Sequence, residues 1–259
     1  MLLILYSALA YLLFLASITW AVGFLADAGV PKTIDSGQPP PWTWALVIDA
    51  GLLLLFAVQH SVMARNTVKQ VLARLVPRPA ERSTFVLLAS AILLLLFWQW
   101  RPLPATVWQV DWAPAAAAVT ALYLVGWALV VASTFMIDHF DLLGLRQAYL
   151  FARSHAYMPV DFKERWLYSW IRHPMMLGLI TAFWATPKMS VGHLVFAAAS
   201  TGYILLGTVL EERDLRENLG AIYDDYRRRV PALIPIPRRR NPKVGTARQR
   251  PADSAIGPV

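Results

Sequence analysis

The sequence contains no cysteine, which excludes disulfides, thiolate metal sites and cysteine nucleophiles. Charged residues are scarce: they make up 15% of the 259 residues, against about 25% in an ordinary globular domain, whereas 57% are hydrophobic. Neither a P-loop nor a GxGxxG motif is present, so the usual soluble nucleotide-binding machinery is missing. Segments of alternating hydrophobicity, which build outer-membrane barrels, are also absent. These absences leave a helical integral membrane protein as the expected class.

Five long apolar segments and one short one are separated by polar connections. The long segments lie at about residues 2–26, 42–63, 83–100, 114–137 and 191–210, close to or above the ~18–20 residues that cross a bilayer as a helix. No basic region precedes the first segment, so we expect it to be retained as a span. Residues 174–186 are too few for an independent span and are expected to pair with the next segment. We predict an all-α integral membrane protein with five to six transmembrane helices, a C-terminal helical hairpin and a cytoplasmic tail helix.

Lysines and arginines are concentrated in alternate connections. Successive connections hold one, five, one, five and one of them, and eleven follow the last span. This is the positive-inside pattern, and it predicts a multi-pass protein of the bacterial inner (cytoplasmic) membrane with both termini in the cytoplasm. Topology also explains the net charge of +8, so membrane lipids are the expected partners and nucleic acid is not.

These patterns divide the chain into three parts. Residues 1–137 are expected to form a four-helix transmembrane scaffold. Residues 138–235 hold a polar connector, the helical hairpin and the cytoplasmic helix, and we expect the site there, at the edge of the apolar sequence. Residues 236–259 are basic and aperiodic, which predicts a disordered tail.

Pro174 opens the short apolar segment directly after Arg172 and His173. A proline at the first helical position leaves the N–H groups of the next turn exposed at the interface, where they can bind an anion or a carboxylate. Arg172 would add a bidentate donor. A basic flank before a proline start is also a common topology signal, so both interpretations stay open.

A stripe of residues beyond the last span is predicted to share one helical face. Its members are Glu212, Leu215, Leu219, Tyr223 and Tyr226. Glu211 points about 100° away from Glu212, so a catalytic dyad is not expected. One of these carboxylates is expected to bond a ligand while the other pairs with a base such as Arg172 or Arg216. The alternative is an amphipathic interface helix with a solvated glutamate.

The connector after the fourth span alternates polar and apolar residues. It reads Asp138-His139-Phe140-Asp141-Leu142-Leu143-Gly144-Leu145-Arg146-Gln147. A histidine between two acids can titrate near neutral pH and act as a base, although a solvated connector explains the same pattern. Asp49 and His60 are ionisable groups inside the second segment, where a functional role and helix pairing are both open.

Four histidines, at positions 60, 139, 173 and 193, make a haem-binding protein an alternative. His193 and His173 are predicted at opposite faces of the membrane, which does not favour axial ligands at one depth. A transporter would show repeated halves with broken helices, and none is evident.

The C-terminal block resembles that of the isoprenylcysteine carboxyl methyltransferase superfamily, integral membrane enzymes that use S-adenosylmethionine. The resemblance rests on Arg172-His173-Pro174-x-x-x-Gly178, two apolar segments, Glu211-Glu212-x-x-Leu215 and Gly220-x-x-Tyr223-x-x-Tyr226-Arg227-Arg228-x-Val230-Pro231. Met176 departs from that family, which commonly has tyrosine there. The departure implies an acceptor other than a prenylated cysteine.

Four stretches, residues 31–35, 59–65, 138–147 and 172–176, are similar to bacterial methanethiol S-methyltransferases, which convert methanethiol to dimethyl sulfide. The resemblance implies S-adenosylmethionine as cofactor, a small apolar thiol as substrate and no metal. The alternatives are another small thiol, a lipid or an isoprenoid acceptor and, in a different class, a haem- or quinone-binding membrane accessory protein.

The same resemblance implies three sets of site residues. Because the attacking group must be a thiolate, a base or a positive field is needed, and the catalytic candidates are Arg172, His139 and Asp138, with His60 as a further base. Cofactor contacts are implied for His173, Pro174, Gly178, Glu211, Glu212, Tyr223 and Tyr226. Substrate contacts are implied for His60, Asp141, Arg146, Gln147 and Met176.

Overall fold

The computed structural model describes residues 1–158, 164 and 166–234, and the predicted disordered tail lies outside them. Almost all regular structure is helical, as predicted. The longer helices are α1 (Leu2–Leu25), α2 (Trp42–Ala64), α4 (Glu81–Gln99), α5 (Ala113–Ile137), α8 (Pro174–Trp184) and α9 (Val191–Leu219). The shorter ones are α3 (Asn66–Leu72), η1 (Arg78–Ala80), α6 (His139–Leu142), α7 (Leu145–Ala152), η2 (Trp166–Ser169) and α10 (Ala221–Arg229).

Within the described residues, five helices are long and apolar enough to cross a membrane: α1, α2, α4 with its preceding turn, α5 and α9. Helix α8 has 11 residues, so the sixth apolar segment is a short helix, as its length predicted. The five long helices coincide with the five long apolar segments of the sequence to within a few residues at most ends. The prediction of an all-α integral membrane architecture is therefore confirmed.

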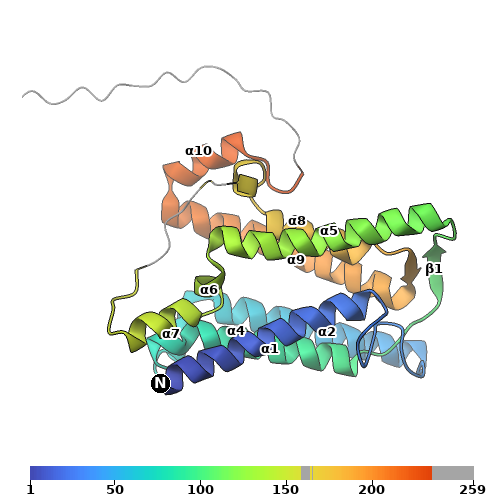
Figure 1. The fold of residues 1–259 in the computed structure, drawn as a ribbon, viewed down its shortest axis with the longest axis horizontal. Helices are drawn as coiled ribbons and strands as arrows, with labels where there is room; N and C mark the ends of the chain where they lie inside the picture. Colours follow the sequence, from blue (N-terminus) through green and yellow to red (C-terminus); the bar gives the residue numbers. More distant parts are fainter. Residues whose placement is uncertain (159–163, 165, 235–259) are drawn as a thin grey trace, which may run out of the picture.

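The long helices form one bundle with two distinct ends (Figure 1). One end, which we call the α10 end, carries α6, α7, α10 and the start of α1. The other, which we call the sheet end, carries strand β1 (Thr106–Gln109), strand β2 (Lys188–Ser190) and the connection from α1 to α2. The connections with few basic residues, those of Lys32, Arg101 and Lys188, therefore lie together at the sheet end.

Helix α8 lies against α5 with a glycine on each side of the contact. A Cβ built on Gly178 would stand 2.7 Å from the carbonyl oxygen of Gly126, and one on Gly126 would stand 2.7 Å from the backbone nitrogen of Ala182. Such close backbone approach is typical of helix packing in membranes, where small residues line the interface. Helices α8 and α9 also contact each other, as the predicted hairpin requires. The closest partner of α8 is nevertheless α5.

The antiparallel pair of β1 and β2 was not predicted. Thr106 faces Ser190 and Gln109 faces Lys188 across the pair, with an irregularity between Thr106 and Trp108. Strands of three and four residues carry too few positions for a period of two to be recognised. The pair ties the α4–α5 connection to the start of α9.

The predicted single face of the tail helix is wrong, because α9 ends at Leu219 and a new helix begins at Ala221. Gly220 between them has φ 55° and ψ −129°, a conformation that favours glycine. The chain turns there, and α10 folds back over the end of α9 (Figure 1). The stripe residues still meet, since Tyr223 and Tyr226 pack with Leu215 and Leu219 in a small buried cluster.

Candidate active site

Arg172 joins three elements at the α10 end. Its Nε donates to Oε1 of Glu212 over 2.8 Å, and its Nη2 pairs with the same oxygen. Its Nη1 donates to the carbonyl oxygens of Arg227, at 3.1 Å, and of Val230. Arg172 is only 7% exposed. A guanidinium with this many partners holds the start of α8, the end of α9 and α10 in one arrangement.

The backbone after α10 returns to the start of α8. The backbone nitrogen of Arg172 donates to the carbonyl of Pro231 over 2.9 Å, and that of His173 donates to the carbonyl of Ala232 over 3.0 Å. The hydroxyl of Tyr226 donates to the carbonyl of Tyr168 over 2.6 Å. Hydrogen bonds therefore hold both α10 and the residues that follow it against the segment before α8.

Glu212 is surrounded by basic groups, whereas Glu211 is not. The Nε2 of His173 lies 3.1 Å from Oε1 of Glu212, and the Nε of Arg227 lies 3.2 Å from Oε2. The side chain of Glu211 is 49% exposed, and its Oε2 lies 3.7 Å from Nδ1 of His173. As predicted, one carboxylate pairs with Arg172, and it is Glu212. Glu211 is left as the carboxylate with surface available to a ligand.

The phenols beside this network act as hydrogen-bonding groups and not as bases. Burial raises the pKa of Tyr223 to about 12, and the nearby Glu212 carboxylate adds to the effect. Burial raises the pKa of Tyr168 to about 12 as well, with a contribution from Glu211. Both hydroxyls therefore stay protonated at neutral pH.

An open, polar cavity of about 420 Å³ adjoins the network. Its lining residues are Arg172, Arg216, Asp224, Arg227 and Arg228. The Nε of Arg216 lies 3.0 Å from Oδ1 of Asp224 across the turn at Gly220. A cavity with four guanidiniums and one carboxylate suits a ligand group of negative charge.

Three more of the predicted site residues lie on α8. Pro174 is buried at its first position, as predicted for a proline start. Gly178 is buried in the contact with Gly126 on α5. Met176 is partly buried against the aromatic and aliphatic core. Helix packing alone accounts for Gly178 and Met176, and their ligand contacts stay predictions.

His139, which was predicted as a base between two acids, bonds to neither of them in the structure. The Nδ1 of His139 lies 2.8 Å from Oγ1 of Thr134, its Nε2 lies 3.0 Å from the hydroxyl of Tyr11, and its ring stacks on Phe135 at 4.2 Å. Burial lowers the pKa of His139, although Asp138 opposes the effect. The ring is therefore neutral at neutral pH, with both nitrogens occupied.

Of the two acids of the connector, Asp138 caps a helix and Asp141 forms a second ion pair. Asp138 caps α6 by accepting from the backbone nitrogen of Asp141 over 3.0 Å. Oδ1 of Asp141 accepts from Nη1 of Arg146 over 2.9 Å, and its Oδ2 accepts from the hydroxyl of Tyr157 over 3.2 Å. Gln147 donates to the carbonyl of Asp141 over 3.0 Å. The connector thus forms its own network, separate from that of Arg172 and Glu212.

His60 lies among aromatic rings contributed by three helices. The distances from its ring centre are 4.9 Å to Phe85 on α4, 5.4 Å to Phe56 on α2 and 6.4 Å to Tyr203 on α9. The guanidinium of Arg82 lies 5.2 Å from the centre of the Phe85 ring. We call His60, Phe56, Phe85, Tyr203 and Arg82 the His60 cluster. The sequence predicted only His60 of this cluster as a site residue. Arg82 is one of five basic residues in its connection, and no local pattern distinguishes it from the others.

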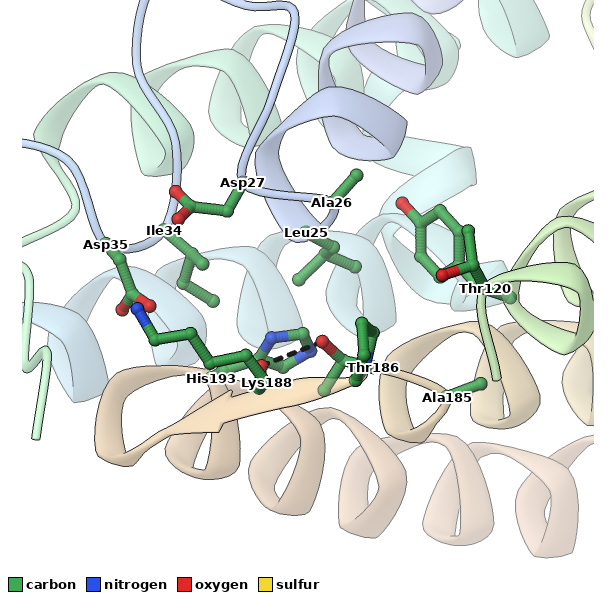
Figure 2. A pocket seen from close by; sticks show the side chains of 12 residues that line it. Leu25, Ala26, Asp27, Ile34, Asp35, Thr120, Ala185, Thr186, Lys188 and His193 are labelled. Atoms are coloured by element: carbon green, nitrogen blue, oxygen red, sulfur yellow. Dashed lines mark hydrogen bonds between the residues drawn. The ribbon is translucent and has the colours of Figure 1, made fainter. Parts of the chain in front are cut away.

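A second cavity, of about 260 Å³, lies at the sheet end (Figure 2). Asp27 and Asp35 line one side of it, and Lys188 and Thr186 line another. Oδ1 of Asp35 is buried without a hydrogen-bond partner in the described part of the chain. Burial raises the pKa of Asp35, which a side-chain hydrogen bond from Ser190 partly offsets. This cavity is at the opposite end of the bundle from Arg172.

Comparison with known proteins gives consistent results. The chain is similar to the NnrU protein family over residues 49–211. It is 52% identical to the methanethiol S-methyltransferase of Mycobacterium tuberculosis over 236 residues, 91% of this chain and 97% of that protein. It is 50% identical to methanethiol S-methyltransferase 2 of Bradyrhizobium diazoefficiens over 232 residues, 90% of this chain and 89% of that protein. Nurim of Bos taurus is 33% identical over 180 residues, 66% of this chain and 68% of that protein. No solved structure matches the chain significantly.

Proposed function

Because this chain belongs to the NnrU protein family and matches methanethiol S-methyltransferases over nine-tenths of its length, we propose that it methylates the sulfur of methanethiol and releases dimethyl sulfide. The observation that carries the proposal is the 52% identity to one such enzyme across 97% of that enzyme's length. A match of this extent includes the membrane helices and the polar network together. It supports a shared reaction and not only a shared fold.

We propose S-adenosylmethionine as the methyl donor. Its amino-acid end carries one positive and one negative charge, and the groups at the α10 end suit both. Glu211 is a half-exposed carboxylate that suits the ammonium group, and the cavity lined by Arg216, Arg227 and Arg228 suits the carboxylate. When bound, the donor supplies an electrophilic methyl group on a sulfonium.

Of the predicted catalytic residues, Arg172 is best suited to a positioning role. Its guanidinium bonds to Glu212 and to the carbonyls of Arg227 and Val230, so it orders the site and has little capacity left to bond a ligand. By holding Oε1 of Glu212, it also fixes the carboxylate to which Nε2 of His173 is bonded. Preorganised groups of this kind lower the barrier to an in-line displacement by holding the reactants in line.

The membrane location fits a small apolar thiol, which partitions into the bilayer and can approach the site between helices. We propose that the α10 end faces the cytoplasm of a bacterial cell and that the chain lies in the cytoplasmic membrane. This orientation places the three connections with few basic residues, at the sheet end, on the opposite side. It also places the polar network on the side where S-adenosylmethionine is made.

The test is headspace detection of dimethyl sulfide from detergent-purified protein given methanethiol and S-adenosylmethionine. We expect product well above the level without enzyme. If the protein binds the donor but makes no dimethyl sulfide, and then methylates a longer thiol or a lipid, the acceptor is that compound and not methanethiol. A Soret absorbance band in the purified protein without donor binding would favour the haem-binding alternative.

A further inference from the structure

Arg82 is a partly buried cation that forms no close ion pair in the described part of the chain, and Asp141 and Glu81 act on it only at longer range. In residues 1–158, 164 and 166–234, no Asp or Glu oxygen lies within 4 Å of its guanidinium. Its Nε donates to the carbonyl of Leu142 over 2.6 Å. The nearby Asp141 is bonded to Arg146 and Tyr157 instead. A guanidinium that is held away from water, with carboxylates only at longer range, attracts an anion.

His60 lies beside this cation with a ring nitrogen available. Its Nδ1 is buried and has no hydrogen-bond partner in the part of the chain that the structure describes. Oε1 of Gln59, the preceding residue, is buried without a partner as well. The hydroxyl of Tyr203 is bonded to Ser61 at 3.1 Å, so it does not serve His60. The charged and titratable groups that face His60 from other helices are therefore Arg82 and Tyr203. Because Arg82 is a cation, His60 can hold a proton only while an anion such as a thiolate lies beside both groups.

The His60 cluster lies within reach of the polar network at the α10 end. Tyr203 and Glu211 are on the same helix, eight residues apart, which is about 12 Å along the axis and about 80° around it. One small cofactor can span that distance. Glu211, the carboxylate assigned to the donor, is therefore closer than Glu212 to the side of α9 that faces the His60 cluster.

We propose that the His60 cluster is the acceptor pocket, in which His60 takes the proton of methanethiol and Arg82 stabilises the thiolate. This inference rests on the proposed function. The S–H bond breaks, the proton passes to Nδ1 of His60, and the electron pair stays on sulfur. That sulfur forms a bond to the methyl carbon, while the bond from this carbon to the donor sulfur breaks and its pair stays on the donor sulfur. His60 then releases its proton to water.

The composition of the cluster favours a thiol over the other acceptors. A carboxylate acceptor is already ionised at neutral pH and needs no base, whereas a thiol with a pKa near 8.5 or above needs both a base and a positive field. His60 and Arg82 supply one of each. The rings of Phe56, Phe85 and Tyr203 lie around His60 and suit an apolar acceptor.

The test compares Arg82→Gln with Arg78→Gln, an exposed arginine of the same connection that loses the same charge. The first readout needs no methyl donor: ¹³C-labelled methanethiol is titrated with pH in the presence of protein, and its chemical shift reports ionisation. We expect bound methanethiol to ionise at lower pH than free methanethiol, and Arg82→Gln to raise the midpoint by about one pH unit or more. Arg78→Gln should leave the midpoint unchanged.

The second readout is turnover. Arg82→Gln should lower kcat/KM for methanethiol by about tenfold or more while equilibrium binding of the donor stays within about twofold. Arg82→Lys keeps the charge and should retain the low midpoint, so it tests the idea even where Arg82→Gln fails to fold. Equal midpoints for wild type and a folded Arg82→Gln protein would overturn the assignment. If wild type lowers the midpoint yet makes no dimethyl sulfide, the proposed function fails and the pocket stands.

Discussion

Arg172 and Glu212 are separated by 40 positions in the sequence, yet the Nε of Arg172 donates to Oε1 of Glu212 over 2.8 Å. The pair connects the segment that precedes α8 to the last turns of α9. His173 and Arg227 bond to the same carboxylate, so one glutamate serves three basic groups, two from the segment before α8 and one from α10. Removing that carboxylate therefore affects the fold as well as the site.

Glu212→Gln should lower the stability of the protein by about 3 kcal/mol, because it leaves the buried Arg172 without its counter-charge. Thermal unfolding in detergent measures the effect. Glu217→Gln is the control, since Glu217 forms an exposed pair with Arg213 and should change stability by less than about 0.5 kcal/mol. Equal unfolding temperatures for the two variants would contradict the structural role of Glu212.

Glu211→Gln should leave the unfolding temperature nearly unchanged and weaken the binding of S-adenosylmethionine by about tenfold. The reason is that Glu211 is half-exposed and keeps a carboxylate surface for a charge-assisted hydrogen bond, worth about 1.5–3 kcal/mol. Equilibrium dialysis with labelled donor measures the affinity. Asp225→Asn removes an exposed carboxylate of α10 and should bind the donor normally. A Glu211→Gln protein of unchanged affinity would remove this residue from the donor site.

Gly178→Ala should destabilise the protein by about 1–3 kcal/mol, because the added Cβ would stand 2.7 Å from the Gly126 carbonyl and force α5 and α8 apart. Gly202→Ala on α9 is a matched control, since no heavy atom lies within 4 Å of its built Cβ. Thermal unfolding of both variants in the same detergent gives the comparison. If Gly178→Ala unfolds like Gly202→Ala while losing donor affinity, Gly178 acts on the cofactor and not on packing.

His139→Gln should reduce the loss of stability in acid. Burial lowers the pKa of His139 in the folded protein, so the unfolded state takes up more protons as pH falls below about 6.5, and folding weakens there. The variant lacks this titration and should lose less stability between about pH 6.5 and 5 than wild type. His155→Gln, at an exposed position, is the control. Identical acid profiles for wild type and His139→Gln would show that His139 carries no such linkage.

The same variant tests the predicted catalytic role of His139. If the ring acts in methyl transfer, turnover falls while donor affinity is retained. Full turnover would leave it as the packing residue that its bonds to Tyr11 and Thr134 already describe.

The number, the class and nearly all the bounds of the long helices were predictable from the sequence, because a span is a local property of some twenty consecutive apolar residues. Local signals also predicted Pro174 at the start of α8. They failed at Gly220, where the helical period continued through a residue that ends the helix. They missed the two short strands, which depend on a partner elsewhere in the chain.

The pairing of polar groups was decided by the tertiary structure. The sequence does not distinguish Glu211 from Glu212. The rotation of α9 relative to α8 decides that Arg172 pairs with Glu212. Arg82 is one of five basic residues in its connection, and only the packing of α2 against α4 brings it to His60. Such contacts depend on helix rotation and depth, which a hydrophobic run does not encode. Apolar length therefore determined the membrane architecture, and helix packing decided which charges remain available for chemistry.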